Sequence, residues 1–382
     1  MDKYFGLAII LFLLSFSSAY SQDVPGDAVQ VDFNSYFDNF GVTVIFPSVS
    51  IDKKISNTTS ITGRYLTDII TAASMKSTFN VDGVTSATPK HVGGGDDHPD
   101  EWRHELGLGL TQQIGEGVIS FNGGYSTEHD YSSRSFIGNI SYPFAKKNTV
   151  LHFGFLGSWD KVFPQVRTWT QPRNTLAYDF SLTQILSKSW LAQLIGSYST
   201  INGYMSNGYQ VVRIITNDSL HTLDVSEPDY RVHRTAGVRT NFGVSKSSTI
   251  ELDYRYYWDN WDINSHTITG SFKTHLSKHV NAEFEYRQYF QTCAYFFKPV
   301  YSQVEQYMAV EGSLNSGYSN EGLVTLTFSG FKNSGFPFMN SDKMELHTTI
   351  GYYHRHTDSP DWFSLYPELY AYLFTLGFKY NF

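Results

Sequence analysis

The chain ends in Leu376-Gly377-Phe378-Lys379-Tyr380-Asn381-Phe382, in which apolar or aromatic residues alternate with small or polar ones. Successive side chains of a β-strand point to opposite faces, so this pattern predicts a strand with one apolar face. A final strand that ends on an aromatic residue is typical of bacterial outer-membrane β-barrels. We therefore expect Phe378, Tyr380 and Phe382 to form the signal that the barrel-assembly machinery reads.

The other end of the chain has the three parts of a secretory signal. Lys3 gives a weakly basic start, residues 5–14 form an apolar core, and Ala19-Tyr20-Ser21 fits a cleavage site before Gln22. The apolar core is too short to span a bilayer. We expect residues 1–21 to be removed during export through the secretory pathway, which leaves 22–382 as one barrel in the outer membrane of a Gram-negative bacterium.

Composition supports an exported barrel and excludes other classes. Aromatic residues make up 16% of the chain, which suits strands that face lipid on one side and need aromatic rings at both interfaces. The net charge of −8 disfavours a nucleic-acid partner. Cys293 is the single cysteine, so no disulfide staples this chain, and no neighbouring base favours a catalytic thiolate.

Residues 250–258 and 280–287 alternate between apolar and polar or charged side chains. A period of two predicts strands that cover one face only. The charged face would be costly in the dry core of a soluble sandwich, whereas a solvated or ion-paired lumen accepts it. We therefore predict that the lumen is lined by Arg239, Glu251, Asp253, Arg255, Glu283, Glu285 and Arg287.

Short and long connections alternate along the chain, as they do between the periplasmic and outer faces of outer-membrane barrels. The long connections, expected outside the cell, lie near 72–100, 160–173, 202–230 and 292–302. Both ends of such a barrel lie in the periplasm, so the number of strands is even. We expect an all-β, transmembrane antiparallel β-barrel of about sixteen strands, with fourteen or eighteen left open. The pattern gives no orientation for 190–199, which is apolar on both faces.

The predicted strands are 28–38, 42–52, 59–71, 101–114, 118–127, 134–143, 149–159, 174–186, 190–201, 232–244, 248–259, 263–276 and 280–291, followed by three more within 301–331, 343–355 and 369–382.

Aromatic residues gather at the predicted strand ends. The outer end of one predicted strand carries Tyr256, Tyr257, Trp258 and Trp261, the outer end of another carries Tyr286, Tyr289 and Phe290, and the inner end of the last carries Phe378, Tyr380 and Phe382. Two levels of amphipathic rings are expected where a barrel meets the two membrane interfaces. Cross-strand aromatic pairing explains the abundance of rings but does not explain the two levels.

One loop has the residue types of a metal site. His91, Asp96, Asp97 and His98 lie close together around three glycines, and imidazoles and carboxylates can hold a divalent cation. No recognised ligand spacing is present, so a solvated outer loop is the favoured interpretation. We expect no cofactor. No serine has a nucleophile-elbow context, so we also expect no enzymatic activity.

Several short blocks resemble a family of uncharacterised bacterial outer-membrane β-barrel proteins, a domain of unknown function. The blocks are Asp68–Ser74, Val81–Pro89, Pro228–Arg231, Tyr254–Thr267 and Tyr286–Gln291, whereas 300–345 departs from the pattern. The resemblance implies a barrel surrounded by outer-membrane lipid. It implies no substrate, because the family has no established one.

Two functions stay open at this point. In a porin-like channel or transporter for small polar solutes, the inward charges would form a selective constriction. In a closed structural or receptor barrel that partners a periplasmic or surface protein, the same charges would be ion pairs that stabilise the wall. An outer-membrane hydrolase is less favoured, because it needs Ser, His and a carboxylate that converge near the lipid interface. We favour the channel.

The terminal aromatic residue yields the first prediction. Deleting Phe382 should lower the amount of barrel in the outer membrane without changing the activity of the molecules that insert, because the terminal strand is the assembly signal. Quantitative immunoblotting of outer-membrane fractions measures this. Wild-type levels of the deletion variant in the membrane would contradict the assignment.

Overall fold

The computed structural model describes residues 24–39, 41–72, 101–216, 219–330, 332, 341–358 and 367–382. The signal segment 1–21 and the candidate metal loop with His91, Asp96, Asp97 and His98 lie outside the described residues. No helix in the described ranges is long and apolar enough to cross a membrane.

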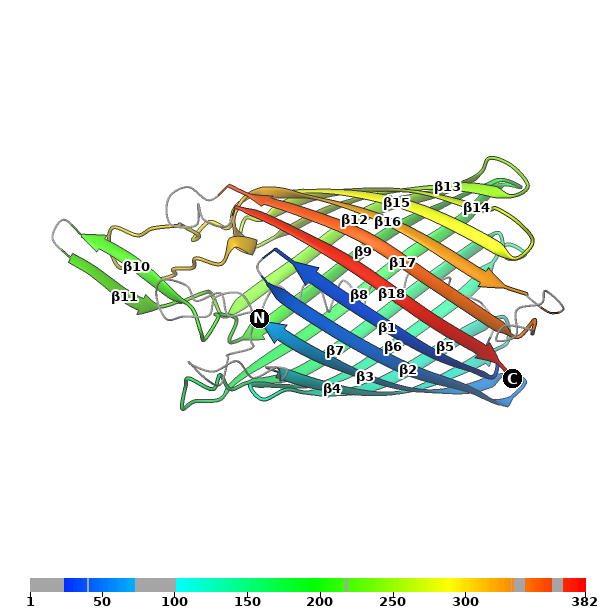
Figure 1. Ribbon diagram of the computed structural model, residues 1–382, viewed down its shortest axis with the longest axis horizontal. Coiled ribbons are helices and arrows are strands. Elements are labelled where there is room, and N and C mark those ends of the chain that lie inside the picture. The colour runs from blue at the N-terminus through cyan, green and yellow to red at the C-terminus, as the bar shows by residue number, and fades with distance from the viewer. Residues whose placement is uncertain are drawn as a thin grey trace.

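Sixteen antiparallel strands close into one tilted barrel, which confirms the predicted fold and strand number (Figure 1). The first and last strands pair, with Ala28 opposite Asn381 and Asp38 opposite Ala371, so the sheet has no free edge. The barrel strands are β1 (Ala28–Asp38), β2 (Val42–Ser56), β3 (Thr59–Ala72), β4 (Glu101–Ile114), β5 (Gly117–Thr127), β6 (Tyr131–Phe144), β7 (Thr149–Val162), β8 (Gln171–Ser187), β9 (Trp190–Gly203), β12 (Tyr230–Gly243), β13 (Ser248–Asp259), β14 (Asn264–His275), β15 (Val280–Gln291), β16 (Gly317–Ser329), β17 (Met344–Thr357) and β18 (Glu368–Asn381).

Apolar side chains cover the outside of the barrel. Leu252, Phe284 and Ile350 are 50%, 50% and 63% exposed in the isolated molecule. In water such a continuous band would be unfavourable, whereas in a bilayer it meets hydrocarbon. The chain is therefore a barrel membrane protein whose polar side chains alternate toward the lumen.

The structure also resolves the segment 190–199, whose faces the sequence left unassigned. Leu194 and Tyr198 point outward and are exposed. Gln193 points inward, where its amide donates to Ser181 Oγ at 3.1 Å, and Ser197 Oγ lies 2.6 Å from Thr235 Oγ1. The inner face of this strand thus carries apolar residues together with polar residues that hydrogen-bond to the neighbouring strands.

Both ends of the barrel chain lie at one mouth, because the number of barrel strands is even. We call it the periplasmic mouth, because most of its connections are short, as they are on that side of outer-membrane barrels. The Phe382 N–H donates to Asp27 O at 3.0 Å, and Lys53 Nζ donates to Asp27 Oδ2 at 2.7 Å. The hydrogen bond from Lys53 lowers the pKa of Asp27. Most connections at this mouth are short, but 330–343 is longer than the periplasmic turns expected from the sequence.

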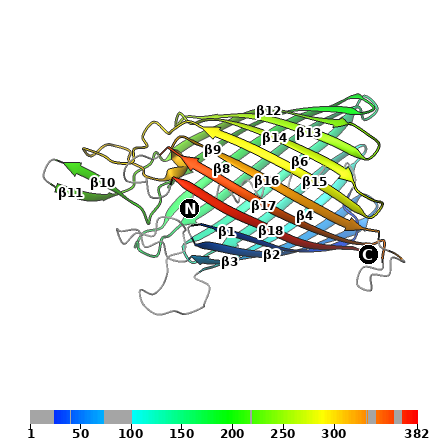
Figure 2. The same ribbon diagram turned by 45° about the horizontal axis from the view of Figure 1, so that its top comes forward.

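At the outer mouth, the loops 204–229, 260–263 and 292–316 join into one substructure, here called the cap. It contains the hairpin β10 (Val211–Thr216) and β11 (Ser219–Asp224), which projects beyond the barrel (Figure 2). It also contains one turn of 3-10 helix, Gly312–Leu314. The loop predicted over 292–302 therefore extends to residue 316. The residues after 301 pack into the cap, and the next barrel strand begins only at Gly317.

The cap has its own hydrophobic core. Val212, Phe296 and Met308 are buried in it, together with Trp261 and Ile263 from the β13–β14 connection. The Ser226 and Met308 backbones exchange two hydrogen bonds, at 2.7 and 2.9 Å, between loops that are distant in sequence. The cap is thus a packed unit rather than a set of independent loops.

Tyr301 lies at the centre of the cap and is fully buried. Its hydroxyl is placed to donate to Phe296 O at 2.8 Å or Ala309 O at 2.9 Å, and it accepts from the N–H of Ala309 at 2.8 Å. Burial raises the pKa of Tyr301 to about 12. The phenol therefore stays neutral and keeps its donor at physiological pH.

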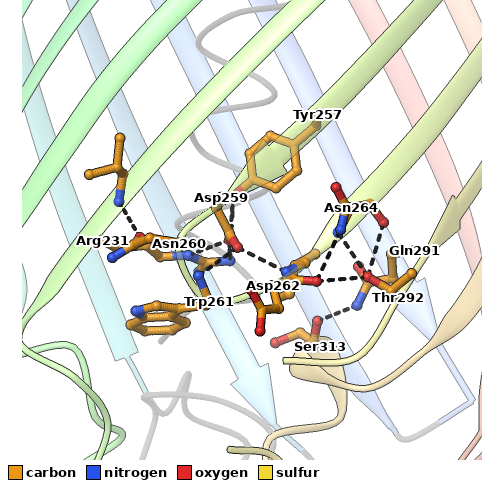
Figure 3. Close-up of polar contacts among 12 residues, drawn as sticks. Arg231, Tyr257, Asp259, Asn260, Trp261, Asp262, Asn264, Gln291, Thr292 and Ser313 are labelled. Atoms are coloured by element: carbon orange, nitrogen blue, oxygen red, sulfur yellow. Dashed lines mark hydrogen bonds and ion pairs between the residues drawn. The ribbon is translucent and has the colours of Figure 1, made fainter. Parts of the chain in front are cut away.

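The β13–β14 connection anchors the cap to the barrel rim (Figure 3). Asp259 Oδ1 accepts from the N–H groups of Trp261 and Ile263, each at 2.9 Å, and its Oδ2 accepts from Arg231 at 2.6 Å. The Arg231 guanidinium lies 4.2 Å from the centre of the Trp261 ring. Trp261 is only 2% exposed, so its predicted place in the lipid-facing girdle is wrong. This tight turn folds the ring into the cap.

The two faces of β15 give the second prediction. Phe284→Arg places a charge in hydrocarbon near mid-membrane and should cost about 2–4 kcal/mol of folding free energy. Glu283→Gln, on the lumen face, should cost much less if water reaches that face. Reversible unfolding from lipid vesicles measures both. Equal costs for the two variants would mean that the faces are reversed.

The cap core gives the third prediction. Tyr301→Phe removes a buried hydroxyl that satisfies several backbone groups, so it should destabilise the cap by about 1–3 kcal/mol. Tyr295→Phe is the matched control, because Tyr295 is 51% exposed. Hydrogen exchange of the amides in 294–314 measures the local stability. Indistinguishable exchange in the two variants would contradict the central role of Tyr301.

Candidate functional site

The lumen wall formed by β12 to β17 holds the predicted polar residues. Leu252 and Tyr254 are exposed on the outside of β13, so Glu251, Asp253 and Arg255 alternate to the inside. The same alternation on β15 places Glu283, Glu285 and Arg287 on the lumen side of that strand, and Arg239 on the lumen side of β12. The structure therefore gathers all seven on one wall.

Most of these charges form ion pairs between adjacent strands. Arg239 Nε lies 3.0 Å from Asp253 Oδ2 and 3.6 Å from Glu251 Oε1. On the next strands, Lys273 Nζ lies 3.1 Å from Glu283 Oε1, and Arg287 Nη1 lies 3.3 Å from Glu321 Oε2. Sequence reasoning missed Lys273 and Glu321, because a cross-strand partner is known only when the register is known.

Two of the predicted charges have no such partner. Within the described ranges, Arg255 and Glu285 make neither an ion pair nor a hydrogen bond through their charged groups. The charged groups that act electrostatically on Arg255 are those of Arg287, Asp253 and Arg239. Those that act on Glu285 belong to Glu283, Glu321, Lys273 and Glu251.

Small hydroxyl residues separate the charged strands. The lumen face of β14 carries Ser265, Thr267 and Ser271, which are buried although they face the lumen. In the ladder, Thr267 lies between Arg255 on β13 and Tyr289 on β15. The long side chains of β13 and β15 therefore cover the short ones of β14.

Arg355 is a further basic residue on this wall that sequence reasoning missed. It lies opposite Ser319 on β16, and Ser319 lies opposite Tyr289. The Arg355 Nε atom is buried without a hydrogen-bond partner in the described part of the chain. Its strand, β17, contains several histidines and few charged residues, so the sequence gave little indication that Arg355 belongs to a charged lumen wall.

Glycines elsewhere in the barrel allow polar side chains to cross between strands. His347 Nε2 on β17 lies 3.1 Å from Asp32 Oδ1 on β1, although β18 runs between them. This approach passes over Gly377, where a Cβ atom would collide with both side chains. The seam between the first and last strands is therefore bridged on the lumen side as well as by the ladder.

Ser141, His152 and Asp179 form a similar contact on β6, β7 and β8. Ser141 Oγ lies 2.9 Å from His152 Nδ1, and His152 Nε2 lies 3.1 Å from Asp179 Oδ2, with Asp179 passing over Gly154. These are the residue types of a hydrolytic triad. They lie in the lumen wall and not at the lipid interface.

The surroundings of these three residues favour a structural contact. His152 is 3% exposed, which leaves little access for a substrate. Ser141 and His152 lie opposite each other within continuous ladders, so the local backbone amides are used by the sheet and do not form an oxyanion hole. His347 and Asp32 make the same kind of contact over Gly377, and no serine takes part in it.

The remaining predicted residues are placed as follows. Phe378 and Tyr380 lie on the outer face of β18 near the periplasmic mouth, and Phe382 directly follows the end of that strand and is 47% exposed. The loop with His91, Asp96, Asp97 and His98 lies outside the described residues. In the part of the chain that is described, no group of three or more His, Cys, Asp or Glu residues is arranged to hold a metal ion.

Cys293 lies in the cap, half-buried, where its Sγ is 3.3 Å from Ala294 O. Burial raises the pKa of this thiol. A thiol with a raised pKa is a poor nucleophile at neutral pH.

Comparisons with solved structures agree with the barrel architecture. A structure titled "Bacterial polysaccharide outer membrane secretin" matches with a TM-score of 0.53 and 6% identity, covering 94% of this chain and 100% of that chain. OccK1 (OpdK) of Pseudomonas aeruginosa has a TM-score of 0.44 and 8% identity, covering 92% and 97%. OmpT of Vibrio cholerae has a TM-score of 0.44 and 9% identity, covering 93% and 96%.

The comparison with curated proteins finds no match. The neighbour with a TM-score of 0.53 shows that the fold is that of an outer-membrane barrel. A family model described as "Protein of unknown function (DUF3570)" matches residues 13–172 and 157–379, most of the chain. This protein belongs to that family of unknown function, which fits the uncharacterised barrel family that its sequence blocks resemble.

Proposed function

We propose that the protein is a channel of the outer membrane for small polar solutes. Barrels of sixteen strands are wide enough that side chains need not fill the interior. The observation that carries the proposal is the wall of β12 to β17, which presents full charges to the lumen and leaves Arg255 and Glu285 without partners.

The ion pairs of this wall divide the charges into two kinds. Arg239, Lys273 and Arg287 hold neighbouring strands together and keep the wall in shape. Arg255 and Glu285 act on the solute instead, because no group among the described residues pairs with either charge at short range. The channel needs no cofactor and carries out no covalent chemistry. The surrounding partners would be outer-membrane lipid and, during insertion, the assembly machinery.

A closed structural or receptor barrel is the second candidate, and the cap favours it. Its buried core and the hairpin β10–β11 form a folded surface at the outer mouth, which a surface partner of a plugged barrel could use. Capture of a stoichiometric partner together with zero conductance would select this function over the channel.

Conductance in a planar bilayer is the fourth prediction. The wild-type barrel should show discrete current steps. The wall holds five acidic residues, Glu251, Asp253, Glu283, Glu285 and Glu321, against five basic ones, Arg239, Arg255, Lys273, Arg287 and Arg355, so little preference between cations and anions is expected. Glu285→Gln should shift the reversal potential in a salt gradient toward anions, whereas Glu116→Gln, in an exposed periplasmic turn, should not. Absence of any current, from the wild type and from the neutralised variants, would end the channel proposal.

A further inference from the structure

Arg255 and Glu285 are uncompensated charges of opposite sign on one lumen wall. The carboxylate that acts electrostatically on Arg255 belongs to Asp253, which is already held by Arg239 at 3.0 Å. The cation that acts on Glu285 belongs to Lys273, which is already held by Glu283 at 3.1 Å. The group of opposite charge that could pair with Arg255 or Glu285 is therefore already in an ion pair with another residue.

Like charges surround both groups. Arg255 has Arg287 and Arg239 beside it, and Glu285 has Glu283, Glu321 and Glu251. Neither group is therefore surrounded by charges of the sign that would neutralise it. Charged side chains without a partner of opposite charge are expected at functional sites. There, a bound ligand can supply the missing charge.

The two charges are separated along the wall in a defined direction. Arg255 is nearer the outer mouth and Glu285 is nearer the periplasm, because β13 runs outward to Asp259 and β15 runs outward to Gln291. Arg355 adds a second arginine at the ladder level of Arg255. A solute from outside therefore meets a basic level first and an acidic level second.

The register gives the scale of this separation. Arg255 is level with Tyr289 across β14, and Glu285 lies four residues before Tyr289 on β15. With about 3.4 Å per residue and about 4.8 Å per strand, the two Cα atoms are about 16 Å apart. Because the β14 residues between them are short, the long Arg255 and Glu285 side chains have room to extend toward each other over β14. An extended peptide of two or three residues spans about 7–11 Å.

We propose that Arg255 and Glu285 form a binding site for zwitterions whose charges are several bonds apart, such as short peptides. The Arg255 guanidinium takes the carboxylate, for which its planar fork is suited. The Glu285 carboxylate takes the ammonium group. This inference deepens the channel proposal, since the solute reaches the site through the lumen.

Four forms of one peptide test the site by calorimetry on the full-length, detergent-purified protein. Triglycine carries both charges, triglycine amide carries only the positive one, N-acetyl-triglycine carries only the negative one, and N-acetyl-triglycine amide carries none. Triglycine should bind about tenfold or more tighter than either singly charged form, because each blocked group loses a charge-assisted contact.

Variants assign each charge to its residue. Arg255→Gln should weaken triglycine to the level of triglycine amide and leave triglycine amide itself unchanged. Glu285→Gln should weaken triglycine to the level of N-acetyl-triglycine and leave that form unchanged. Lys188→Gln and Glu116→Gln, in exposed periplasmic turns, are the matched controls and should not change any affinity.

A charge-swapped double variant guards against loss of folding. Arg255→Glu combined with Glu285→Arg keeps one charge of each sign and should recover triglycine binding, with the peptide reversed.

Two results would overturn the site. The first is equal affinity of the wild type for all four peptides, and the second is weaker binding of the uncharged peptide, N-acetyl-triglycine amide, to Arg255→Gln. Current without zwitterion preference would reject the site and keep the channel. Binding without current would keep the site and reject the channel.

Discussion

A membrane's hydrocarbon core offers no hydrogen-bond partner to the protein backbone, so a sheet that crosses it must close on itself. The rest of the structure depends on that closure, which pairs β1 with β18 along their whole length. The seam is reinforced on the lumen side, where His347 reaches Asp32 across Gly377. Only glycine leaves room for that crossing. The strand that ends the chain is thus also the strand that removes the last free edge.

Closure also separates two environments on the two faces of every strand. The outer face presents residues such as Phe284 and Leu252 to lipid, and the inner face can then hold charges that a dry core would not accept. Cross-strand pairs such as Arg287–Glu321 neutralise most of these charges. The charges left over, on Arg255 and Glu285, are the ones that a solute can use. The lumen charges that are paired therefore stabilise the wall, and those that are not paired recognise the solute.

The sequence was sufficient for the barrel, because a period of two is a local property. Strand number, the faces of β13 and β15 and the lumen position of residues such as Glu283 followed from alternation. What depends on register did not follow, since no local pattern tells which residue opposes Arg287. The cap was missed for a related reason. Trp261 looks like a girdle residue in sequence, and only the tight turn at Asp259 and the packing against Phe296 place it in a core.

The division of β15 into a lipid face and a water face is the claim on which all of this rests. Single cysteines at each position from 280 to 291, in a Cys293→Ser background and in lipid vesicles, can be tested with a charged, water-soluble thiol reagent. The account predicts that reactivity alternates, with high rates at 283, 285 and 287 and low rates at 282, 284 and 286. Uniform reactivity, or the opposite alternation, would contradict it.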